Sequence, residues 1–422
     1  MKFQKITLKN GLRIILAPMQ DTDTATVLIM TGVGSRYETR SENGLAHFLE
    51  HMFFKGTEKR PTALDISKEL DGLGAEYNAF TGEEYTGYYA KVASKHWMTA
   101  LDVVSDLFLN AKLEQEEIDR ERGAILQELN MRGDIQRIQV EEHFKKLLYG
   151  DTPLGWSTGG PKENIKSFMR KDFIKFLDRA YVAPNIVVGV AGKIDSKIVR
   201  KEIEKIFANV REGKKPAIKK AADKQSVPGV IVQNKKTDQT HVVVGVRAFD
   251  MFHKDRATLS VLSTILGGGM SSRLFIEVRE RRGLVYTIRT GAELFLDAGY
   301  LSTYMGVEHE NIEKALRVVL DEYKKIATEA VGKDELKKAK ESIKGRMALG
   351  LEGSDDVVEY LVAQEVLQDK IVLPKDKVKA IDRVTAEDVL RVAKMIFTDK
   401  RLNIAVIGPE AKQTKLEKLL HL

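Results

Sequence analysis

Alternating apolar and polar residues near the start of the chain predict a β-hairpin. Residues 3–8 alternate, residues 9–11 hold an Asn-Gly turn signal, and residues 12–17 form a second, largely apolar run. Residues 25–31 are β-branched or apolar throughout, which predicts a buried strand. The chain is therefore expected to begin with strands of a sheet.

Helical and strand signals then alternate through the first half. Further expected elements are a helix over residues 63–73 capped by Thr62, two strands within 75–89 around Gly82, a helix over 95–109, a long helix over 114–148 interrupted near Gly133, a helix over 170–181 and a strand over 185–192. Residues 43–54 form a mostly apolar run with Gly44 near its start, and they are also expected to be helical.

The second half repeats this order of elements. The strand expected over residues 241–247 corresponds to 25–31, the strand pair over 284–304 to 75–90, and the last strand, 402–408, to 186–192. An offset of a little over two hundred residues indicates duplicated domains and not a short-repeat solenoid. Between the halves, a basic, Pro-punctuated segment poor in aromatic residues is typical of an exposed linker. The expected division is a domain over residues 1–210, a linker over 211–228 and a homologous domain over 229–422.

The helix expected over residues 43–54 carries a candidate metal site. His47 and His51 are four residues apart, so a helix places both on one face, within reach of a single cation. Glu50 projects toward that face and could act as a general base on water. His-x-x-Glu-His is also a signature of zinc proteases. The alternative is a helix with two surface or capped histidines and a solvated glutamate.

A second helix offers the third ligand that such a site needs. The chain has no cysteine, so the remaining ligand must be His, Asp or Glu. Glu121 and Glu128 are two helical turns apart on the long helix expected over residues 114–148, and therefore share a face. The other histidines are expected to be structural.

With these residues the chain resembles the pitrilysin-type (M16) zinc metallopeptidases, which are also called inverzincins. Its length resembles that of the shorter branch of this family, which contains mitochondrial processing peptidase and bacterial homologues. The resemblance implies a metalloendopeptidase with one Zn2+ per chain, held by His47, His51 and Glu128. Glu50 would be the catalytic base, and Glu121 would hydrogen-bond the ligands or orient a ligand histidine.

The same resemblance implies the fold. We expect an α+β protein of two homologous duplicated α/β domains, each a mainly antiparallel sheet packed with helices, the LuxS/processing-peptidase-like metallohydrolase fold. Residues 1–210 would form the metal-binding catalytic domain. Residues 229–422 lack the metal motif and would complete a substrate chamber.

The resemblance also implies a substrate site. Asn78 and Ala79 match a sheet-edge segment on which an unstructured peptide adds as a β-strand. The alternative is an ordinary hairpin. Arg279 and Tyr286 match a pair aimed at the substrate backbone, where they could stabilise an oxyanion. The alternative is an arginine in a charge-rich helix and a tyrosine in the core.

The composition and charge of the chain limit the classes of partner that are expected. The net charge of +7 is mild for 422 residues, and no Arg-rich run is interleaved with aromatics, so no nucleic-acid partner is expected. The N-terminus does not have the features of a signal peptide, and no apolar run is long enough to span a bilayer, so a cytoplasmic protein without membrane contact is expected.

Peptides are the expected substrates and a homodimer is the expected assembly. The rivals are a non-catalytic scaffold or subunit of a heteromeric processing protease, and a zinc hydrolase of non-peptide substrates.

Overall fold

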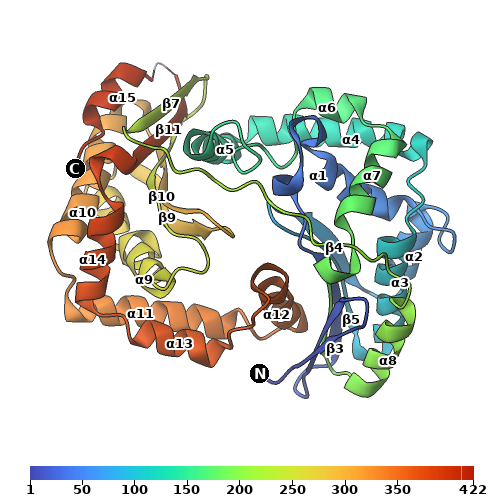
Figure 1. Cartoon of the computed structure of the whole chain (residues 1–422). Helices are drawn as coiled ribbons and strands as arrows, with labels where there is room; N and C mark the ends of the chain where they lie inside the picture. The colour runs from blue at the N-terminus through green and yellow to red at the C-terminus, as the bar shows by residue number, and fades with distance from the viewer. Residues whose placement is uncertain (410) are drawn as a thin grey trace. The chain divides into compact units, whose positions relative to one another are not determined.

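The computed structural model describes residues 1–409 and 411–422, which form two units. Unit 1 is built from Met1–Asn130, Ser157–Lys219 and Ala348–Val372, and unit 2 from Met131–Trp156, Lys220–Met347 and Leu373–Leu422. Each unit contains one sheet with helices against both of its faces (Figure 1). The expected α+β class and the duplicated two-domain plan are confirmed.

Unit 1 holds a 6-stranded sheet in the order β1-β2-β6-β3-β5-β4. Its β2–β6 pair is parallel and its other pairs are antiparallel. The strands are β1 (Gln4–Thr7), β2 (Arg13–Pro18), β3 (Thr24–Thr31), β4 (Glu76–Thr81), β5 (Thr86–Ala93) and β6 (Ile186–Gly192). The helices that begin in this unit are α1 (Leu45–Met52), α2 (Ala63–Asp71), α3 (Trp97–Asn110), α4 (Gln115–Asp134), α6 (Lys162–Ser167), α7 (Arg170–Ala180), α8 (Ser196–Ile206) and α12 (Ser354–Gln368).

Both faces of this sheet are covered, which explains its nearly unbroken apolar strands. In β2, Ile14 and Leu16 face the core that also contains α1, α3, α7 and α8, whereas Ile15 and Ala17 face α12. Among the described helices, α12 packs on one face of this sheet, while α3 and α8 pack on the other (Figure 1). Arg13 fixes this helix, because its guanidinium donates to the buried Glu365 carboxylate at 3.1 Å.

Unit 2 holds a 5-stranded sheet in the order β7-β11-β8-β10-β9. Its β7–β11 pair is parallel and the rest are antiparallel. The strands are β7 (Gly229–Asn234), β8 (Thr240–Arg247), β9 (Val285–Leu294), β10 (Gly299–Val307) and β11 (Leu402–Gly408). The helices that begin in this unit are α5 (Gln136–Tyr149), α9 (Arg256–Gly267), α10 (Ile312–Thr328), α11 (Lys333–Leu349), α13 (Pro374–Asp382), α14 (Ala386–Ile396) and α15 (Gln413–Leu419).

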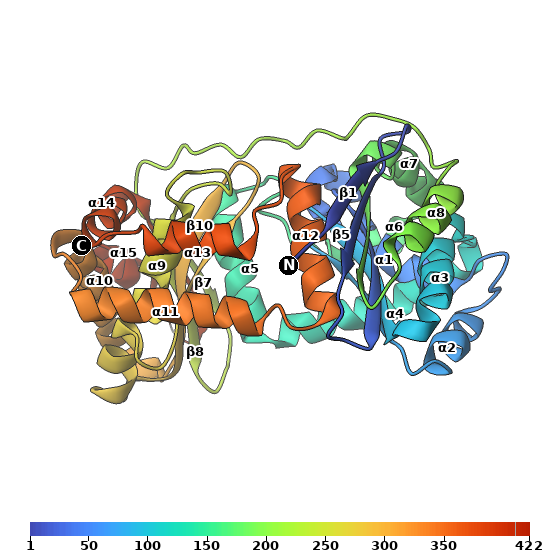
Figure 2. The same cartoon turned by 90° about the horizontal axis from the view of Figure 1, so that it is seen from below.

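The two halves of the sequence exchange a helix. α5 lies in the first half, yet its Val140 and Phe144 pack with Val243 and Ile407 of the second sheet. α12 lies in the second half, yet it belongs to unit 1 (Figure 2). The strands of the first sheet all lie before residue 211 and those of the second sheet all lie after residue 228, whereas the units that enclose the two sheets are not contiguous in sequence.

Most expected elements of the first half are present with boundaries shifted by a few residues. The break expected near Gly133 falls at Ile135, between α4 and α5. Residues 211–228, the segment interpreted as a linker, contain no helix or strand. Within residues 1–409 and 411–422, no helix combines the length and apolar character needed to span a bilayer.

Candidate metal centre

The first element of the candidate site is α1, whose sequence fixes which side faces outward. Gly44 caps it with φ +100, a left-handed conformation that glycine adopts without strain. A Cβ at this position would lie 2.7 Å from the Gly159 carbonyl oxygen. Phe48 anchors the inner face, with its ring 5.1 Å from that of Phe173. With the apolar side chains buried, the half-exposed Glu50 and His51 lie on the remaining face.

The second element is α4, which carries two carboxylates on the stripe that it turns toward the core. Ile118, Glu121, Ile125 and Glu128 are spaced by three, four and three residues, so they lie along one side of the helix. Both isoleucines are fully buried in the core that includes α1. Their packing holds the two glutamates against the histidine-bearing helix.

His47, His51 and Glu128 come together as the sequence predicted. Nε2 of His47 lies 3.4 Å from Oε1 of Glu128, and Nε2 of His51 lies 3.4 Å from Oε2. One ligand atom from each residue lies within 4.8 Å of the others. Zinc bound at about 2.0–2.2 Å in a tetrahedron holds its ligand atoms roughly 3.3–3.6 Å apart, so this donor set fits the ion. Hydrogen bonds from the two histidines keep the pKa of Glu128 well below its usual value, and hence keep it an anionic ligand.

Glu121 orients one of these ligands. The Nδ1–H of His51 donates to Oε1 of Glu121 at 2.9 Å, which leaves Nε2 directed at Glu128. The other oxygen of Glu121 is paired with Lys55. Burial would lower the pKa of His51, but hydrogen bonds to Glu121 and Glu128 outweigh it and raise this pKa to about 9.

Thr81 was missed by the sequence analysis. It ends β4, and its hydroxyl donates to Oε2 of Glu50 at 2.5 Å. Glu50 comes from α1, so this contact fixes the candidate base from a different element. No local spacing connects two residues that are this far apart in sequence, and a threonine in a strand is ordinary.

Asn78 and Ala79 lie on β4, the edge strand of the first sheet. Among the described residues, β4 pairs with a strand on one side only. The backbone N–H of Ala79 donates to the exposed Asn78 side chain at 2.8 Å. The strand that leads to Thr81 therefore has a free edge of the kind to which a peptide can add.

Arg279 and Tyr286 belong to unit 2 and lie together there. The Arg279 guanidinium carbon is 5.5 Å from the centre of the Tyr286 ring, and 4.7 Å from that of Phe275. Tyr286 is 78% exposed, so it is not the core tyrosine of the alternative interpretation. Its hydroxyl is accessible to a ligand.

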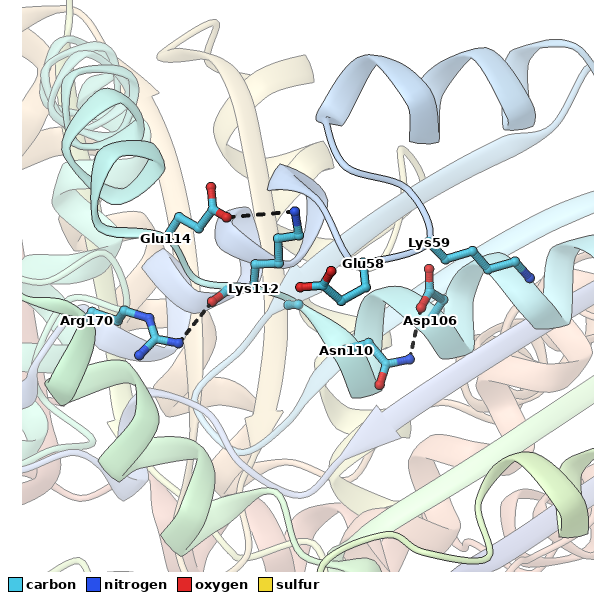
Figure 3. Close-up of a pocket in the computed structure, with 8 residues that line it drawn as sticks. Glu58, Lys59, Asp106, Asn110, Lys112, Glu114 and Arg170 are labelled. Carbon is cyan, nitrogen blue, oxygen red and sulfur yellow. Dashed lines mark hydrogen bonds and ion pairs between the residues drawn. The ribbon is translucent and has the colours of Figure 1, made fainter.

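Other parts of the described structure offer no second centre of this kind. Among the described residues, no other three His, Asp or Glu side chains are grouped closely enough to hold a metal. A cavity of about 730 Å³ in unit 1 is lined by charged groups that pair with one another (Figure 3). Lys112 lies 3.7 Å from Glu114, Asn110 donates to Asp106, and Arg170 donates to the Lys112 carbonyl.

Comparisons with known proteins identify the family of the chain. Residues 13–162 match the family model described as Insulinase (Peptidase family M16), and residues 167–343 match the one described as Peptidase M16 inactive domain. The first match contains all three candidate metal ligands. The second begins after them.

Relatives and solved structures resemble the chain over nearly its whole length. An uncharacterized zinc protease from Streptomyces coelicolor is 34% identical, with 96% of this chain and 89% of the relative covered. One from Bacillus subtilis is 31% identical, with 96% and 98% covered. A crystal structure of a protease from Helicobacter pylori superposes with a TM-score of 0.89 at 25% identity, covering 97% of this chain and 99% of that one.

Proposed function

Because the chain belongs to peptidase family M16, we propose that it is a zinc-dependent endopeptidase that hydrolyses unstructured peptides. The observation that carries the proposal is the grouping of His47, His51 and Glu128, whose donor atoms, one from each residue, all lie within 4.8 Å of one another. Glu50 lies on the same helix and completes the set that peptide hydrolysis requires. We further propose one zinc ion per chain.

The residues divide the chemistry among them. Zinc held here would supply a Lewis acid that polarises the peptide carbonyl and makes water acidic. Glu50 takes the proton of the attacking water and delivers it to the departing amine. Thr81 holds one oxygen of that carboxylate in place, leaving the other to receive the proton. Glu121 fixes the tautomer of His51.

Substrate binding is proposed on the free edge of β4. A peptide that adds there pairs through its backbone, which gives affinity without reading many side chains. Asn78 and Ala79 lie on this strand, and Thr81 at its end contacts the base. A peptide on this edge would thus lie along the strand that leads to Glu50.

Arg279 and Tyr286 are proposed to stabilise the negative charge that develops on the scissile carbonyl oxygen. A guanidinium and a phenol are suitable donors for an oxyanion. The exposure of Tyr286 and the cationic group over its ring support this role. We propose that the protein acts as a cytoplasmic homodimer.

The alternative is a non-catalytic M16-like scaffold, or a subunit of a heteromeric processing protease. The inactive-domain match over residues 167–343 favours a non-catalytic role for that part of the chain only, because the candidate ligands lie outside the matched segment. A scaffold does not need Glu50 or its contact with Thr81.

The test is metal content measured beside hydrolysis of a quenched, unstructured peptide. The proposal predicts about one zinc per chain, activity abolished by a chelator and restored by zinc, and little hydrolysis of simple esters. Zinc bound stoichiometrically without cleavage of any peptide in a broad panel would favour the scaffold. Preferential hydrolysis of non-peptide substrates would contradict the peptidase assignment.

A further inference from the structure

A buried carboxylate marks the start of the metal-bearing helix. Glu38 is 3% exposed and lies five to eight residues before the groups it binds. Its Oε1 accepts from the Ala46 backbone N–H at 2.7 Å, and its Oε2 accepts from the Gly44 backbone N–H at 3.0 Å and from Asn43 Nδ2 at 3.1 Å. Amide groups at a helix start have no partner within the helix. Glu38 supplies that partner from a separate segment.

The segment that carries Glu38 is itself fixed by a buried ion pair. Arg36 is 1% exposed and pairs with Glu84, which is 3% exposed. The backbone N–H of Arg36 also donates to the Glu83 carbonyl at 2.8 Å. Residues 83 and 84 belong to the turn between β4 and β5. The segment therefore joins the start of α1 to the hairpin whose strand β4 ends at Thr81, the partner of Glu50.

The length of α1 makes this attachment important. The helix has eight residues and His47 lies in its first turn. A helix this short has little stability of its own, so tertiary contacts decide its direction. An ordinary cap comes from the residue next to the helix and is commonly exposed, as Asp195 is at α8. Glu38 is instead buried, lies six residues before the cap position Gly44, and is bound to two backbone amides and one side chain.

We infer that Glu38 is a positioning residue for the metal centre: by holding the first turn of α1, it sets the direction in which His47 presents Nε2 to Glu128. The inference rests on the proposed metal site. Glu38 contacts no ligand atom and is not a catalytic residue. Loss of Glu38 should therefore change the metal affinity and the ligand geometry of the site, in addition to any change in the stability of the protein.

The experiment compares wild type with Glu38→Gln, which keeps the size of the side chain and replaces one acceptor oxygen by a donor. Zinc affinity is measured by chelator competition, and ligand geometry by the visible spectrum of the cobalt-substituted protein. We expect a folded variant that binds zinc about tenfold more weakly. This is the lower end of the loss of metal affinity found when a residue that supports a metal ligand is replaced. The cobalt spectrum should change, and kcat should fall while KM stays within about twofold.

The matched control is Asp195→Ala, which removes the acceptor that caps the helix. Asp195 caps α8 in the same unit by accepting from Lys197 and Ile198, and α8 carries no candidate ligand. This variant should lose stability yet keep the zinc affinity and cobalt spectrum of wild type. Glu38→Asp, which retains the carboxyl group but is one methylene shorter, should fall between wild type and Glu38→Gln.

A folded Glu38→Gln protein with wild-type zinc affinity and cobalt spectrum would overturn the inference. So would failure of both Glu38 variants to fold, because the residue would then support the whole unit and not the site. If wild type binds zinc but cleaves no peptide, the proposed function fails, while the affinity and spectral measurements still decide the role of Glu38.

Discussion

The hydroxyl of Thr81 donates to the carboxylate of Glu50 across 2.5 Å. The contact joins the last residue of the edge strand β4 to the helix that bears both candidate histidine ligands. In the proposed mechanism, the base and the strand that receives the substrate are thereby physically linked. The orientation of Glu50 then depends on β4 being in place.

Replacing Thr81 by valine tests this link. Valine has the same shape but no hydroxyl, so Glu50 loses the hydrogen bond that orients it. We expect kcat to fall roughly tenfold, corresponding to ~1.4 kcal/mol, with zinc content unchanged. Thr81→Ser keeps the hydroxyl and should retain most of the activity. Equal kcat values for the valine and serine variants would refute a role for the hydroxyl.

Replacing Glu121 by glutamine tests the orientation of His51. The variant weakens the hydrogen bond that His51 Nδ1 makes at 2.9 Å. Zinc affinity should fall by about 10–100-fold, the usual cost of losing such an outer partner. Competition with a chromogenic chelator measures it. Lys55→Met, which removes the other partner of Glu121, should have a smaller effect; a larger loss than in Glu121→Gln would contradict the assigned roles.

The raised pKa of His51 predicts how the stability of the metal-free protein depends on pH. Hydrogen bonds raise this pKa from 6.5 to about 9 on folding. The stabilisation is fully present below pH 6.5 and is lost as the pH rises through about 9. The free energy of unfolding should therefore decrease over this interval. Urea unfolding at a series of pH values measures it.

Two controls isolate His51 in that measurement. Saturating zinc occupies the nitrogen that would otherwise be protonated, so the contribution should disappear from the metal-bound protein. Glu121→Gln should reduce it in the metal-free protein, because Glu121 provides the first of the hydrogen bonds that raise the pKa. An identical slope in all three samples would mean that other groups govern the pH dependence.

Replacing Arg279 by alanine tests the proposed oxyanion donors. Turnover should fall by about a hundredfold, as when one such donor is removed, with zinc content unchanged. Tyr286→Phe should act in the same direction. Arg281→Ala is the control, since Arg281 is exposed and pairs with Glu277 one helical turn away. Loss of zinc from the Arg279 variant, or an equal loss of turnover in the control, would contradict the assignment.

The metal set could be predicted because each part has a local signature. His47, Glu50 and His51 lie within five residues, and the spacing of Glu121 and Glu128 matches two helical turns. Helical periodicity places such residues on one face regardless of what lies around them. The choice of Glu128 as the ligand, and of Glu121 as the residue that supports the ligands, came from the family resemblance.

The helix exchange and the supporting contacts had no such signature. Nothing in the sequence shows which sheet α5 or α12 covers. The roles of Thr81 and Glu38 depend on contacts between segments that the fold alone brings together. A buried glutamate in particular cannot be recognised from the sequence, because most glutamates lie on the surface.

The decisive measurement is made on Glu50→Gln, with zinc content and peptide hydrolysis determined on the same preparation as wild type. The substitution keeps the shape of the side chain and touches no metal ligand, but it removes the group that accepts a proton. The account predicts the same zinc stoichiometry as wild type, with hydrolysis of the unstructured peptide reduced by several orders of magnitude. A zinc-loaded variant that cleaves the peptide at the wild-type rate would show that Glu50 is not the base and that the proposed mechanism is wrong.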